Sequence, residues 1–63
     1  MKSAVPVEEL VKCAEREVRY RKHVYPRLIK NGRITHRKAA AEIENMEAIL
    51  ALLREMEASE RLL

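Results

Sequence analysis

The stretch LIKNGRIT, residues 28–35, decides the fold, because it separates two long segments whose apolar residues have helical spacing. Asn31 and Gly32 are the residue types that adopt the left-handed conformation at the end of a helix. Thr35 is a preferred N-cap, because its hydroxyl accepts a hydrogen bond from an N–H group of the next turn. The stretch therefore predicts a turn over about residues 31–34 between two helices.

The segment before the turn predicts a helix over about residues 6–30. Pro6 suits its first turn, where the missing N–H group would have no partner. Pro26 predicts a kink or an end near Tyr25, because proline cannot donate the helical hydrogen bond, and a further turn is expected through Leu28 and Ile29. The apolar positions recur at spacings of three and four: Val7, Leu10, Val11, Ala14, Val18, Tyr25 and Leu28.

The segment after the turn predicts a second helix over about residues 36–60, without glycine or proline and rich in strong helix formers. Its apolar face is too wide for one antiparallel helix to cover, because Ile49, Leu50 and Leu52 spread around the helix at one level. A second contact surface is therefore expected. The predicted oligomer interface consists of Ile49, Leu50, Leu52, Leu53 and Met56.

Length and composition predict a single all-α domain over residues 1–63, an antiparallel two-helix hairpin that dimerises into a four-helix bundle. A chain of this size buries only about 60% of the surface that it exposes when unfolded. The single cysteine, Cys13, cannot form an intramolecular disulfide. Oligomerisation is the remaining route to stability, so a homodimer is expected.

Arg21 falls where the first apolar stripe expects an apolar residue. An unpaired charge facing the seam between the helices costs several kcal/mol, so Arg21 is expected to pair with a carboxylate. The predicted structural ion pair joins Arg21 to Glu17, one turn earlier, or to Glu42 or Glu44 across the hairpin.

Positive charge is concentrated around the turn. Nine of the thirteen Lys and Arg residues lie between Arg16 and Lys38, and Glu17 is the one acid among them. Such a patch attracts phosphate backbones or an acidic protein surface. The alternatives are an ordinary solvated end of the hairpin, or a bend that lies beside the acidic second helix of an antiparallel partner. A protein partner is preferred over nucleic acid. The predicted contact residues are Arg19, Lys22, Arg27, Lys30, Arg33 and Arg37.

No residue pattern indicates catalysis. Paired acids such as Glu8-Glu9 are ordinary on a solvated helix, and acid–base chemistry needs a pocket that a two-helix chain does not supply. His23 and His36 lack the further ligands of a metal site, and one glycine cannot form a phosphate-binding loop. The sequence predicts a non-enzymatic protein with no cofactor, no metal and no small-molecule substrate.

No apolar run approaches the roughly 18 residues of a membrane span. The first five residues lack the apolar region of a secretory signal. A lone Cys13 is typical of a reducing compartment. We therefore expect no membrane association and a location in the cytosol.

Several short motifs resemble a group of small uncharacterised proteins of bacteriophages and prophages. They are Arg16-Glu17-Val18, Arg21, Val24-Tyr25-Pro26-Arg27, Gly32-Arg33, Thr35, Ala41-Glu42-Ile43 and Met46, within about residues 14–49. The resemblance implies a helical accessory protein in the cytosol of a bacterial host, acting by inhibiting a host enzyme or by modulating recombination or replication. The predicted function is thus a non-enzymatic interaction or regulatory protein; the alternative is a nucleic-acid-binding hairpin dimer.

Overall fold

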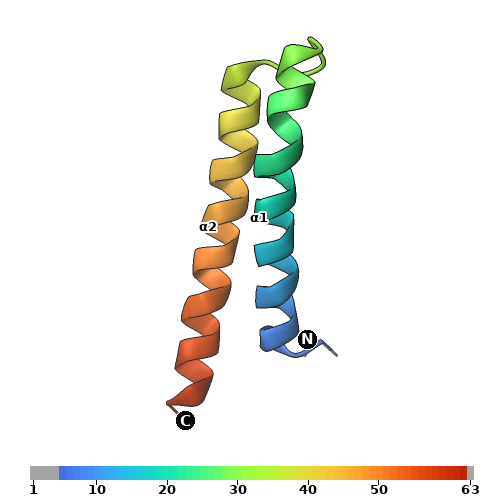
Figure 1. Ribbon diagram of the computed structural model, residues 1–63. Helices are drawn as coiled ribbons and strands as arrows, with labels where there is room; N and C mark the ends of the chain where they lie inside the picture. The colour runs from blue at the N-terminus through green and yellow to red at the C-terminus, as the bar shows by residue number, and fades with distance from the viewer. Residues whose placement is uncertain (1–4, 63) are drawn as a thin grey trace.

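The computed structural model describes residues 5–62, which form two helices joined by a short turn (Figure 1). Helix α1 spans Val7–Lys30 and helix α2 spans His36–Arg61. They run antiparallel and side by side, so the two ends of the chain lie at the same end of the molecule. This part of the chain is therefore an all-α hairpin, as the sequence predicted.

Helix α1 begins directly after Pro6, which occupies the N-cap position and provides no side-chain cap. The backbone N–H groups of Glu9 and Leu10 instead donate to the Pro6 carbonyl oxygen, at 3.0 and 3.2 Å. The carboxylates of Glu8 and Glu9 lie in the first turn, where they interact favourably with the positive end of the helix dipole.

Helix α1 continues through Pro26 to Lys30, which matches the predicted range of about 6–30, and of the predicted kink or break the break does not occur. Pro26 is exposed and lies close to the C-terminal end of the helix. Its missing N–H group therefore costs one hydrogen bond at a site that water reaches. The turn after Pro26 is held by the half-buried side chains of Leu28 and Ile29, and the Asn31 N–H group donates to the Arg27 carbonyl oxygen at 3.0 Å.

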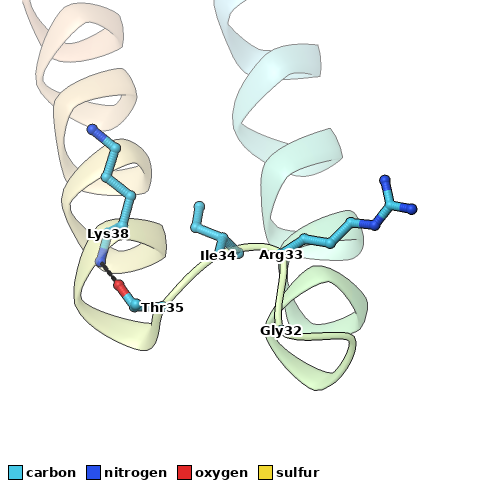
Figure 2. A pocket seen from close by; sticks show the side chains of 5 residues that line it. All are labelled: Gly32, Arg33, Ile34, Thr35 and Lys38. Carbon is cyan, nitrogen blue, oxygen red and sulfur yellow. Dashed lines mark hydrogen bonds between the residues drawn. The ribbon is translucent and has the colours of Figure 1, made fainter.

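The turn reverses the chain at Gly32, which has a φ of 71° and is the one described residue with positive φ. Asn31, expected to share this conformation, has a φ of −85°. The N–H groups of Gly32 and Arg33 donate to carbonyl oxygens of the last turn of α1. Helix α2 is then capped by the Thr35 hydroxyl, which accepts a 3.0 Å hydrogen bond from the Lys38 N–H group (Figure 2).

The core is a single seam between the helices. Val11, Ala14 and Val18 of α1 pack against Leu50 of α2, and partly buried Val7, Met46 and Leu53 extend this cluster; Ala39 is also buried. Within residues 5–62, no side chain is less than 2% exposed. The hairpin thus shields its apolar residues without enclosing any of them completely.

Replacing Pro26 with alanine should stabilise the hairpin. Alanine restores the hydrogen bond to the Lys22 carbonyl oxygen and removes the ring clash, a gain of about 3 kcal/mol. The unfolded chain of the alanine variant has more conformational freedom, which lowers this gain by about 1 kcal/mol. The expected increase in the free energy of unfolding is therefore about 2 kcal/mol. Urea unfolding followed by circular dichroism measures the change, with exposed His23→Ala as the control. Unchanged or lower stability of Pro26→Ala would show that α1 does not continue through this residue.

Candidate interaction surfaces

The guanidinium of Arg21 links the two helices. Its Nε donates to Glu17 Oε1 at 2.8 Å within α1. Its Nη1 donates to the carbonyl oxygen of Glu42 in α2 at 2.9 Å and to Glu42 Oε2 at 3.4 Å. The structure therefore brings Arg21, Glu17 and Glu42 together, whereas Glu44, the other carboxylate considered, lies exposed.

The environment of Arg21 explains why a cation is tolerated beside the seam. The hydrogen bond to Glu17 raises the pKa of Arg21, and burial of the guanidinium opposes this effect. A raised pKa means that the folded state binds the Arg21 proton more tightly than the unfolded chain does. The resulting stabilisation is complete at every pH below the unfolded-state pKa of arginine, which includes the whole neutral range. The side chain is 22% exposed, so these hydrogen bonds are partly shielded from water. Arg21 is best described as a structural clamp between the helices.

The two sides of the hairpin differ, and one of them is polar. Lys22 pairs with Glu47 at 3.1 Å, and Arg54 pairs with Glu15 at 2.9 Å. Both pairs cross from α1 to α2. A helix turns by about 100° per residue, which places these four residues on the same side of the seam. Two ion pairs therefore bridge this polar side.

The opposite side of the hairpin carries an apolar groove with a volume of about 260 Å³. Leu10, Cys13 and Ala14 line it from α1, and Met46, Ile49 and Leu53 line it from α2, with Glu17 at its edge. Exposed Met56 lies one turn beyond Leu53 on α2. We call the surface formed by these residues the apolar side of the hairpin.

The predicted oligomer interface divides between the seam and the surface. Leu50 is buried in the core, and Leu53 packs against it. Ile49, Leu52 and Met56 are 47%, 61% and 53% exposed. The sequence assigned all five residues to the oligomer interface, and the structure shows that α1 covers Leu50 and partly covers Leu53. Ile49 and Met56 remain exposed on the apolar side, and Leu52 points away from the seam.

The predicted contact residues surround the turn but are not equivalent. Lys22 is engaged with Glu47. The other five are exposed and have no acidic partner within the part of the chain that the structure describes: Arg19, Arg27, Lys30, Arg33 and Arg37. Between Arg27 and Lys38 the sequence contains five cations and no acid. We call this end of the hairpin the basic bend.

The face of α1 opposite the seam carries a row of cations that shares Arg27 and Lys30 with the basic bend. Arg16, Arg19, Arg27 and Lys30 are exposed at positions three, eight and three apart, with exposed His23 between them. This spacing places them on one face of the helix. Tyr20 lies beside them and is 60% exposed. We call this set the outer stripe; the helical period was the signal that could have identified Arg16 and His23.

The turn itself has a shallow hollow lined by Gly32, Arg33, Ile34, Thr35 and Lys38 (Figure 2). The Arg33 side chain extends away from α2, and the Lys38 side chain runs along α2, where its Nζ pairs with Glu42 Oε1 at 3.1 Å. The two cations therefore do not converge on a common ligand. The hollow itself offers no geometry for holding a phosphate between them.

The described residues contain no group of three His, Cys, Asp or Glu side chains placed to hold a metal ion. Cys13 is a free, exposed thiol on the apolar side. Neither helix in the described range is long and apolar enough to cross a membrane.

Comparisons of the chain with protein-family models, curated proteins and solved structures found no match. The resemblance to phage and prophage proteins stays a prediction from the sequence.

Replacing Arg21 with alanine should lower the free energy of unfolding by about 1.5–3 kcal/mol, because partly buried carboxylate and carbonyl groups lose a charged donor. Arg21→Lys should recover part of the loss, since an ammonium group retains the charge but not the two-sided geometry. Chemical denaturation measures both variants.

The matched control is Lys22→Ala, which removes an adjacent, exposed ion pair and should cost at most about 1 kcal/mol. Equal losses for Arg21→Ala and Lys22→Ala would contradict the assignment of Arg21 as a clamp.

Proposed function

We propose that this chain is a non-enzymatic interaction protein that works as a homodimer and regulates a macromolecule by binding an acidic surface on it. The observation that supports this function most strongly is the basic bend, where five cations lie within twelve residues that contain no acid. A cluster of one sign attracts an oppositely charged partner over several ångströms and accelerates association. The cations act in recognition.

Two features support recognition as the role of these cations. Arg27, Lys30, Arg33 and Arg37 have no ion-pair partner in residues 5–62, whereas Lys22, Lys38 and Arg54 each pair with a glutamate. The unpaired cations also lie on a rigid helix end and a capped turn, so binding orders little backbone. The basic bend is thus a surface whose charges are available to a partner.

The homodimer proposed here is a four-helix bundle. It is supported by the small core, in which no described side chain is fully enclosed, and by exposed Ile49 and Met56 beside the apolar groove. Packing a second hairpin there would enclose the seam from one side.

A protein with an acidic surface is the first partner class, and the chain is proposed to act in the cytosol of a bacterial host as a phage or prophage accessory protein. The resemblance of the motifs around Val24-Tyr25-Pro26-Arg27 supports this setting. Inhibition of a host enzyme is a role that such a surface can perform without chemistry of its own.

A nucleic acid is the second partner class, and the outer stripe favours it. Four cations follow one helix face over fifteen residues, which matches a repeating row of phosphates better than a local acidic patch does. Exposed Tyr20 beside the stripe adds an aromatic ring on which an unpaired base can stack.

Reversing the charge of Arg27, Lys30 and Arg33 to glutamate should abolish partner capture, because the bend then repels the same acidic surface. Tagged protein is used to capture partners from bacterial lysate with and without nuclease. The matched single variants are Arg33→Glu at the bend and Arg61→Glu at the other end, which change the net charge equally. Capture that survives the triple reversal would contradict the proposal. Equal losses of capture in Arg33→Glu and Arg61→Glu would contradict it as well.

A salt titration separates the two partner classes. Affinity for a labelled duplex should fall linearly in a log–log plot if phosphates are bound, and the triple reversal should reduce the slope by about 3. Nuclease-resistant capture together with no measurable duplex binding would assign the protein to an acidic protein partner. Nuclease-sensitive capture with the steep slope would assign it to nucleic acid.

A further inference from the structure

We infer that a second copy of the chain docks on the apolar side in antiparallel orientation, so that α1 faces the partner's α1 and α2 faces the partner's α2. The inference rests on the homodimer proposed above and specifies its surface and its geometry. Both follow from three properties of one hairpin: the difference between its two sides, the surface area that it exposes, and the distribution of charge along its length.

The two sides of the hairpin differ in what packing would bury: on the apolar side the Arg21–Glu17–Glu42 cluster lies toward the bend, and the groove occupies the rest. The polar side is closed by the Lys22–Glu47 and Arg54–Glu15 pairs, which a docking hairpin would have to desolvate. The apolar side offers the groove with exposed Ile49 and Met56 along one edge. A second copy is therefore expected to dock on the apolar side.

The exposed area fits a second copy of this size. The chain has an accessible surface of 5383 Å². A compact monomer of 7.4 kDa exposes about 4,200 Å². The difference, on the order of 1,000 Å², is comparable with the roughly 800 Å² that each partner contributes to a standard interface. A self-association of ordinary size thus brings the chain close to the surface expected of a stable small protein.

Charge selects the orientation. In a parallel dimer the two basic bends would lie together, with five cations on each and no acid between Arg27 and Lys38. In an antiparallel dimer the bends lie at opposite ends, separated by a length comparable with the 47 Å long axis of the hairpin. This far exceeds the screening length of about 8 Å at physiological salt, so the repulsion between the two bends is screened. The repulsion that remains is between the two outer stripes, whose charges are spread along α1 and not gathered at one end. The open end of the partner then lies toward the basic bend. Its acids are Glu8, Glu9, Glu55, Glu57 and Glu60, of which Glu8 pairs with Lys12 and Glu57 with Arg61.

Two-fold symmetry determines which helices meet. When two hairpins meet through the same side and run antiparallel, the symmetry axis is perpendicular to the helices, and each helix faces its own copy. Both α1 helices then lie along one face of the bundle. A parallel dimer would place α1 against the partner's α2 and put the two α1 helices at opposite corners.

The antiparallel dimer therefore combines both outer stripes into one cationic face. Arg16, Arg19, Arg27 and Lys30 of each copy would lie on it, which makes eight cations on one surface. The outer face of α2 has no comparable stripe, since it carries one exposed cation, Arg37, and two exposed acids, Glu44 and Glu55. One chain thus supplies half of this cationic face, and the second copy supplies the other half.

The orientation is measured as the distance between the two bends. Cys13→Ala removes the native thiol and keeps this part of the groove apolar, and Asn31→Cys then provides one attachment site for a nitroxide label at each bend. Pulsed electron paramagnetic resonance should return a distance near or above the 47 Å long axis. A distance of about 20 Å, two helix diameters, would establish a parallel dimer and overturn the inference. A sample without dipolar coupling that sediments as a single chain would overturn it as well.

The docking surface is tested by two double variants with equal charge changes and equal spacing. Ile49→Glu with Met56→Glu places two carboxylates on the apolar side, and the dimer dissociation constant should rise by at least about 100-fold. Ala51→Glu with Ala58→Glu places the same charges on the polar side, at exposed positions also seven apart, and should leave the dimer intact. Equal dissociation of both variants, or none in either, would contradict the assigned surface.

These outcomes are independent of the partner experiments. A long distance between the bends together with unimpaired capture by the triple charge reversal would retain the dimer and reject the proposed function. A short distance together with charge-dependent capture would retain the function and reject the orientation.

Discussion

One seam between two helices is the constraint on which the rest of this structure depends. Each helix has a neighbour on one side only, so even the most buried residues, Ala14 and Ala39, remain 3% exposed, and Leu50 remains 7% exposed. Dispersion and hydrophobic terms grow with the number of surrounding atoms, and a side chain open on one side forfeits part of both. A hairpin of this length therefore has a small free energy of unfolding. The Arg21 clamp and the Thr35 cap contribute a larger fraction of that free energy than they would in a bigger domain.

The distribution of charge and apolar surface gives each part of the hairpin a separate role. Ion pairs close the polar side, the groove with Ile49 and Met56 opens the other, and unpaired cations occupy the bend and the back of α1. Self-association and recognition are proposed to use different surfaces, so a dimer that covers the groove leaves the outer stripe accessible. In this account the same charges that recognise a partner also set the orientation of the dimer.

The sequence predicted the helices and the turn well, because the apolar period, the Asn31-Gly32 dipeptide and Thr35 are local signals that tertiary contacts reinforce. At Pro26 a kink or an end was expected, but the helix continues, because the half-buried side chains of Leu28 and Ile29 hold the turn after the proline. Leu50 and Leu53 were assigned to the oligomer interface with exposed Ile49 and Leu52, because one helix was expected to leave part of this wide face uncovered; the structure places Leu50 and Leu53 at the seam. The two unlike sides could not be predicted, because they depend on pairs such as Lys22–Glu47 that form only when the helices are in register.

The central claim is that one chain leaves too much apolar surface exposed and must associate with a second copy. Sedimentation equilibrium combined with thermal unfolding at several micromolar concentrations tests it most directly, because a dimer that melts to unfolded chains has a concentration-dependent midpoint. We expect a mass of two chains and a melting temperature that rises with protein concentration. A single-chain mass with a cooperative transition at one temperature, independent of concentration, would contradict it.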